Sequence, residues 1–134
     1  MGMKFLANNM FEDGWYLVDL ETAGIDPLRD DIIAVRIAYM VNYKIKDEKA
    51  YYIKPREPLS PKLEELTGLT NTMLDSGVQL DSVVEELQSL KAPLVFFYED
   101  CAKFLNVAWR ICGKSFDMAY LALDGLAAIV FGYS

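Results

Sequence analysis

The sequence has no histidine, only two cysteines, and fewer basic than acidic residues (13 against 20). Histidine is the commonest general base in enzymes, so its absence excludes a Ser-His-Asp triad and a Cys-His pair. Cys101 and Cys112 do not form a C-x-x-C pattern. This argues against a disulfide framework or a zinc site, and it favours reduced thiols in a cytoplasmic protein.

The charge and the hydropathy of the chain exclude further classes. A net charge of −7 repels nucleic acid unless metal ions or a local basic patch reverse the field. The chain opens without the continuous apolar run of a signal peptide, and its last apolar stretch is too short and too acid-interrupted to span a membrane. The length of 134 residues predicts one domain over 1–134, with an irregular segment at 1–13 and no membrane partner.

The first half of the chain predicts an antiparallel meander. Residues 15–19 are almost wholly apolar, as a strand covered on both faces would be, and apolar residues alternate over 31–41 and again over 49–54. The polar segment 42–49 predicts the turn between the second and third strands. Alternation of this kind indicates strands, so three strands are expected here.

Helix signals follow the meander. Ser60 and Pro61 have the pattern of an N-cap followed by proline in the first turn, and Gly68 predicts the end of that short helix. Ser82 and Glu85 have the spacing of a capping box, which predicts the start of a longer helix there.

Three segments complete the chain. Residues 94–98 are typical of a buried strand, which we expect to lie parallel to the first strand after a crossover helix. Apolar residues fall on one helical face over 101–112, and Gly113 predicts the end of that helix. Residues 116–131 look helical but apolar almost all round. Because such a helix must be covered, we expect a homo-oligomer formed through it.

Two carboxylates, Asp19 and Glu21, stand at the end of the first predicted strand. Side chains alternate across a strand, so residues i and i+2 lie on the same face. Convergent carboxylates suit hard cations such as Mg²⁺ or Mn²⁺, which support phosphodiester hydrolysis in two-metal sites. The alternative is a solvated strand end without function, and the flanking sequence must decide between them.

The segments LVDLETAGIDP (17–27) and LTGLTNTML (66–74) resemble two motifs of the DEDD 3′–5′ exonucleases, in the proofreading epsilon type of bacterial DNA polymerase III. Their order and separation match that family. The resemblance implies an α/β, RNase H-like exonuclease fold, shortened at its C-terminus. Such a fold has a mixed sheet of three antiparallel strands plus one or more parallel strands, flanked by helices.

The resemblance also implies a chemistry. The family holds two metal ions with four carboxylates and orients a water molecule with a histidine or a tyrosine. Asp19 and Glu21 match its first motif, in which both residues are metal ligands. Mg²⁺ or Mn²⁺ would be the cofactor, and the 3′ end of a single-stranded nucleic acid would be the partner.

The second motif of the family is only partly matched. Cys101 falls where the family has its third carboxylate, and Asp100 is one residue away. Asp100 is therefore either a metal ligand or the N-cap of the helix that begins there. Asp117 lies in a similar local sequence, although no apolar strand precedes it.

Tyr120 and Asp124 have the Y-x-x-x-D spacing of the family's third motif. On a helix, this spacing puts both side chains on one face. The resemblance then assigns water orientation to Tyr120 and metal ligation to Asp124. Asp124 is otherwise a partly buried polar group or an interface residue.

Three hypotheses follow from these matches. The chain is a metal-dependent 3′–5′ exonuclease whose catalysis is impaired, because its second and third motifs are incomplete. Alternatively it is a non-catalytic binding or interaction module on a degenerate exonuclease fold, or a structural domain in which Asp19 and Glu21 are relics.

Overall fold

A computed structural model describes residues 14–124 of the chain. Its sheet consists of β1 (Trp15–Thr22), β2 (Ile32–Val41), β3 (Lys44–Tyr52), β4 (Leu94–Phe96) and β5 (Tyr120–Ala122), in the order β3-β2-β1-β4-β5. The first three strands pair antiparallel, and β4 and β5 add to the β1 edge in parallel. This is the mixed sheet that the sequence predicts.

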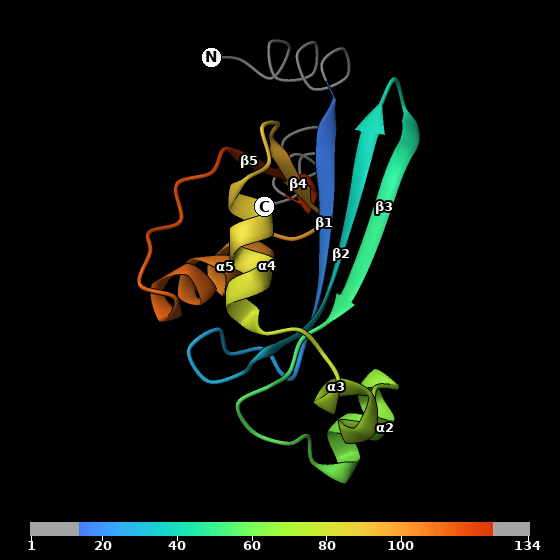
Figure 1. Cartoon of the computed structure of the whole chain (residues 1–134), viewed down its shortest axis with the longest axis vertical. Coiled ribbons are helices and arrows are strands. Elements are labelled where there is room, and N and C mark those ends of the chain that lie inside the picture. The colour runs from blue at the N-terminus through green and yellow to red at the C-terminus, as the bar shows by residue number, and fades with distance from the viewer. Residues whose placement is uncertain (1–13, 125–134) are drawn as a thin grey trace.

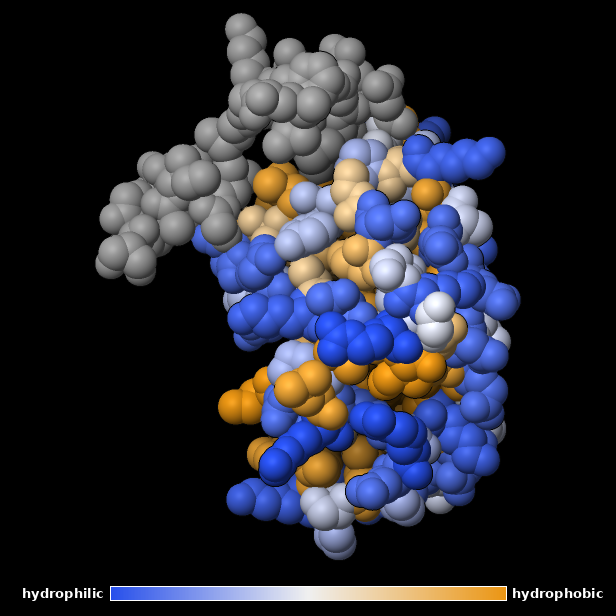
Figure 2. All heavy atoms as spheres, turned by 90° about the vertical axis from the view of Figure 1, so that its left-hand side faces the viewer, coloured by the Kyte–Doolittle hydropathy of each residue, from blue (hydrophilic) through white to orange (hydrophobic). Residues whose placement is uncertain are grey.

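The helices are α2 (Pro61–Thr67), α3 (Asn71–Asp75), α4 (Leu80–Gln88) and α5 (Asp100–Ile111). Helices α4 and α5 lie against one side of the sheet, whereas α2 and α3 lie beyond its lower end in Figure 1. Viewed from the side of α4 and α5, the surface is mostly hydrophilic, with apolar side chains showing between the polar ones (Figure 2). Within residues 14–124, no helix is long and apolar enough to cross a membrane.

The main core lies between the sheet and α4 and α5. Val18, Val35 and Ile37 point from the strands into a cluster that includes Leu87 and Leu105. Since strand side chains alternate, the residues between them on β1 and β2 point to the other side of the sheet. The apolar pattern of these strands therefore fixes the direction of Asp19.

The turn of the meander is shorter than predicted. Asn42 and Tyr43 have φ angles of 50° and 65°, so two residues with left-handed backbone join β2 to β3, and the turn predicted at 42–49 is wrong. Strand β3 is exposed along most of its length. Edge strands of this kind carry charged side chains that discourage pairing with further strands. In β3 these charged residues interrupt the apolar alternation by which a strand is recognised in the sequence.

The helix signals are partly confirmed. The Ser60 hydroxyl accepts a hydrogen bond from the backbone N–H of Leu63 at 3.2 Å, and Gly68 ends α2 with a φ of 74°. The capping box prediction is wrong, because α4 begins at Leu80 with Gln79 at its N-cap. Ser82 therefore lies inside the first turn.

The helix predicted over 116–131 is wrong over residues 116–122, although residues 123 and 124 are helical. Residues 120–122 form β5, whose Leu121 pairs with Val95 of β4. A short apolar run fits a buried strand as well as a helix, and the free edge of β4 decides between them. Residues 125–134 lie outside the described part of the chain. The homo-oligomer inferred from this helix is not tested by the described residues and stays a prediction.

Candidate functional site

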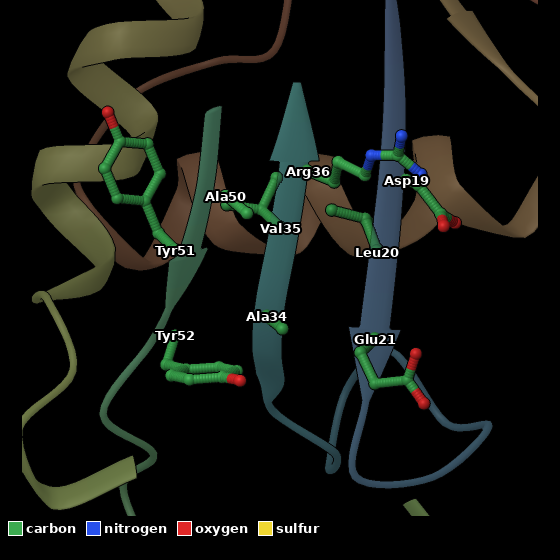
Figure 3. Close-up of a pocket in the computed structure, with 9 residues that line it drawn as sticks. All are labelled: Asp19, Leu20, Glu21, Ala34, Val35, Arg36, Ala50, Tyr51 and Tyr52. Atoms are coloured by element: carbon green, nitrogen blue, oxygen red, sulfur yellow. The ribbon is translucent and has the colours of Figure 1, made fainter. Parts of the chain in front are cut away.

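Asp19 and Glu21 lie on the side of β1 that faces away from the main core. Val18 belongs to that core and Leu20 packs against it. Asp19 and Glu21 alternate with these residues, so their carboxylates are directed outward and are exposed. Figure 3 shows both carboxylates on the same side of the strand. The i, i+2 geometry predicted from the sequence is thus present.

A hollow of about 300 Å³ lies beside these carboxylates, across the first three strands. It is lined by Asp19, Leu20, Glu21, Ala34, Val35, Arg36, Ala50, Tyr51 and Tyr52. The small side chains of Ala34 and Ala50 leave room in its floor. The hollow is open to solvent, so a hydrated ion or a phosphate group has access to the carboxylates.

Arg36 is the basic residue among those that line the hollow. It pairs with Asp19 in the β1–β2 register, and its Nε donates to Oε1 of Glu48 on β3. The hydrogen bond and the charge of Glu48 raise the pKa of Arg36, and the charge of Asp19 adds to this effect. The sequence reasoning missed Arg36 and Glu48, although the alternation in 31–41 could have placed Arg36 on the face of Asp19.

The loop after β1 is built by the remaining residues of the first motif. The Thr22 hydroxyl donates to the carbonyl of Gly24 at 2.7 Å. The Asp30 carboxylate accepts from the backbone N–H of Asp26 at 2.9 Å, and a side chain at Gly24 would collide with it. Asp26 in turn accepts from the N–H of Leu28 at 3.0 Å. These contacts give a structural reason for the T-x-G-x-D pattern.

Cys101 is the second-motif position, and it lies beside β1. Burial raises the pKa of its thiol, and the charge of Asp19 raises it further, while backbone hydrogen bonding at Tyr98 and Leu20 acts in the opposite direction. The thiol is therefore neutral near neutral pH. The fold thus brings the second-motif position toward Asp19, but with a thiol in place of a carboxylate.

Asp100 is the first residue of α5, and Glu99 is the N-cap, so the N-cap interpretation of Asp100 is wrong. Its side chain is 74% exposed and pairs with Lys103 at 3.2 Å. Asp117 is exposed in the connection between α5 and β5.

Tyr120 and Asp124 do not share a helical face, because Tyr120 lies in β5. Both contact Glu99 instead. The Tyr120 hydroxyl donates to Oε1 of Glu99 at 2.7 Å, and this hydrogen bond raises the pKa of Tyr120. The Asp124 carboxylate oxygens lie 3.1 and 3.2 Å from the backbone nitrogen of Glu99, which donates to them. The two side chains therefore brace the connection between β4 and α5.

A two-metal cage is not formed by the described residues. Within residues 14–124, no three His, Cys, Asp or Glu side chains come close enough together to hold a metal ion. Mg²⁺ often keeps several waters and binds through one or two carboxylates plus substrate phosphate. Asp19 and Glu21 fit one hydrated ion of this kind.

The exonuclease family of RNase T type matches residues 17–106. The PolC-type DNA polymerase III of Thermotoga maritima is 35% identical over 80 residues, which are 59% of this chain and 6% of that protein. The 3′–5′ exonuclease DinG of Bacillus subtilis is 29% identical over 82 residues, which are 60% of this chain and 9% of that protein. The chain thus spans less than a tenth of the length of these relatives.

Solved structures share the fold. The nuclease domain of 3′hExo, a DEDDh family member bound to rAMP, superposes with a TM-score of 0.65 at 22% identity, over 78% of this chain and 62% of that one. Exonuclease I of E. coli in complex with a dA16 oligonucleotide superposes with a TM-score of 0.72 at 14% identity. The superposition covers 88% of this chain and 30% of that one. The RNase H-like exonuclease fold predicted from the sequence is confirmed.

The family match includes Asp19 and Glu21 of β1 and Cys101 of α5. It also includes both segments from which the resemblance was inferred. The chain therefore belongs to the exonuclease family, within the DEDD superfamily of 3′–5′ exonucleases.

Proposed function

We propose that this chain is a 3′–5′ exonuclease-like, nucleic-acid-processing domain that binds Mg²⁺ or Mn²⁺ through Asp19 and Glu21 and whose catalysis is impaired. The observation that carries the proposal is the position of these two carboxylates. They lie within the segment that matches the family, on the solvent-facing side of β1, and beside an open hollow.

The roles of the side chains follow from their chemistry. A divalent ion supplies charge neutralisation for a phosphodiester under attack. Asp19 and Glu21 would hold the ion, and the shallow hollow would admit the phosphate beside it. Both carboxylates are exposed, so a metal ion can reach them directly from solvent.

Impaired catalysis is supported by two features near this pair. The second-motif position carries Cys101, whose raised pKa keeps it as a neutral thiol. Tyr120, the candidate for orienting water, commits its hydroxyl hydrogen to Glu99. Loss of one ligand from a two-metal site weakens at least one of the metals.

The proposed substrate is the 3′ end of a single-stranded nucleic acid. The support comes from the relatives, since exonuclease I of E. coli is seen with a DNA oligonucleotide and 3′hExo with rAMP. With an overall charge of −7, the chain would depend on its metal ion to approach a polyanion.

A second candidate is a non-catalytic binding or interaction module on the same fold. The observation in its favour is that Asp100, Tyr120 and Asp124 all contact other residues of the chain. Side chains that are engaged in contacts of this kind are not free to bind a metal ion or to orient water.

Degradation of a 3′-labelled single strand, measured together with calorimetric titration of Mn²⁺, tests the proposal. We expect Mn²⁺ binding and slow release of mononucleotides, both lost in Asp19→Ala. Asp117→Ala, which removes an exposed carboxylate from another segment, should behave as the unmodified chain. Asp100→Asn and Asp124→Asn test whether either residue contributes a ligand.

The outcomes separate the candidates. Mn²⁺ binding without cleavage of DNA or RNA would favour the binding module. Cleavage that survives Asp19→Ala would overturn the assignment of the site, and the absence of both binding and cleavage would overturn the proposed function.

A further inference from the structure

The positively charged side chain of Arg36 lies next to the proposed metal-binding carboxylates. Arg36 pairs with Asp19 across the β1–β2 ladder, and side chains of directly opposed residues lie on the same face of a sheet. Figure 3 shows the Arg36 side chain extending from β2 over β1, with its guanidinium next to Asp19. Both residues line the same hollow.

Glu48 holds Arg36 in this position. Its Oε1 accepts from Nε of Arg36, and it reaches Arg36 diagonally, since the register pairs Glu48 with Ala38. With Nε engaged, the Nη groups remain to interact with a second anion. Asp19 is the residue directly opposite Arg36 on β1, so the two opposite charges attract each other.

We propose that Arg36 is a built-in counter-cation for Asp19, and that it lowers the affinity of the Asp19–Glu21 pair for divalent ions. This inference rests on the proposed function, because it concerns the same pair of carboxylates. Arg36 competes with the ion for Asp19, and its positive charge also repels the ion from the hollow.

The expected size of the effect follows from Coulomb's law. A unit charge and a divalent ion about 6 Å apart in water repel each other enough to change the affinity about tenfold. Removal of the Arg36 charge should therefore tighten Mn²⁺ binding about tenfold. A lysine at this position keeps the charge, so Arg36→Lys should bind Mn²⁺ about as weakly as the unmodified chain.

The test is a titration of the protein with Mn²⁺, in which free Mn²⁺ is measured by electron paramagnetic resonance. Arg36→Gln should bind about tenfold more tightly than the unmodified chain. Arg110→Gln is the matched control, because Arg110 is exposed on α5, which lies behind the sheet in Figure 3. The affinity of the Arg110→Gln variant for Mn²⁺ should equal that of the unmodified chain. Circular dichroism checks that each variant is folded, and Arg36→Met replaces Arg36→Gln if the glutamine variant fails to fold.

The results distinguish this inference from the proposed function. If Arg36→Gln and the unmodified chain bind Mn²⁺ equally, and Asp19→Asn abolishes binding in both, the metal site stands and the role of Arg36 is overturned. Weaker binding by Arg36→Gln also overturns it. If neither the unmodified chain nor Arg36→Gln binds Mn²⁺, both the metal site and the role of Arg36 are overturned.

Discussion

The two sides of the β1–β2–β3 sheet differ in composition and in how much they contribute to the stability of the fold. The side against α4 and α5 is apolar and closed, with Val18 and Leu87 fully buried. The other side carries the exposed carboxylates of β1 and the Arg36–Glu48 ion pair. Burial of apolar groups stabilises the fold, whereas exposed charges contribute little. The outer side can therefore gain or lose a metal site while the fold persists.

This difference explains why membership of the family does not decide activity. The family match and the superposed structures depend on the strands and the core, which the inner side maintains. In the proposed site, catalysis would depend on a few groups near Asp19, and one of these positions carries Cys101. The predictions below test this separation, from the largest expected effect to the smallest.

The largest effect is expected for Leu105→Ala on α5. Leu105 is 1% exposed within the main core, and removal of a buried leucine side chain costs about 2–5 kcal/mol of unfolding free energy. Asp19→Asn on the outer side should change it by less than about 0.5 kcal/mol. Urea unfolding followed by circular dichroism measures both. Equal losses in the two variants would contradict the separation of the two sides.

Cys101→Asp should rebuild part of the missing site. A carboxylate there adds a negative charge beside Asp19, so we expect about 10–100-fold tighter Mn²⁺ binding, by analogy with losses when metal sites are disrupted. Without metal the melting temperature should fall, because like charges meet, and added Mn²⁺ should raise it. Thermal melts with and without Mn²⁺ measure this.

The matched control for this substitution is Cys112→Asp, which introduces the same side chain just after the other end of α5. Its melting temperature should not respond to Mn²⁺ more than that of the unmodified chain. An equal response in both variants would show that Cys101 is not beside the metal.

Gly24→Ala should distort the loop that follows the carboxylates. The added methyl group would collide with the Asp30 carboxylate and disturb its hydrogen bond from Asp26. Steric insertions of this kind cost about 1–3 kcal/mol. Gly68→Ala, with open space around the position but a φ of +74°, separates a steric collision from backbone strain. Chemical unfolding of both variants checks the result, and relief by Asp30→Ala is expected only for Gly24→Ala.

Tyr51→Phe should lower the unfolding free energy by about 0.5–1.5 kcal/mol, the smallest loss expected among the destabilising substitutions. The Tyr51 hydroxyl donates to Glu86 of α4 at 2.8 Å, and this hydrogen bond is the main reason that the pKa of Tyr51 is raised above 10.0. A raised tyrosine pKa contributes stability that is fully present below pH 10 and is lost as pH rises through the folded value. Unfolding measured from pH 8 to 11 should show a shallower decline in the variant.

Much of the fold could be read from local pattern. Ser60 and Gly68 bound α2 because capping depends on side-chain and backbone preferences of neighbouring residues. The limits of β3 and β5 could not be read in this way. Strand β3 is an exposed edge whose first residues, 44–48, are mostly charged, and β5 is an apolar run whose form depends on the free edge of β4.

The sequence by itself placed Asp19 and Glu21 on one side of a strand, because alternation is a property of the backbone. It also placed Cys101 at the second-motif position by counting. The tertiary structure alone decided that Arg36 lies opposite Asp19 and pairs with Glu48, and that Tyr120 and Asp124 contact Glu99. These contacts depend on strand register and on the pairing of distant segments, which local sequence does not encode.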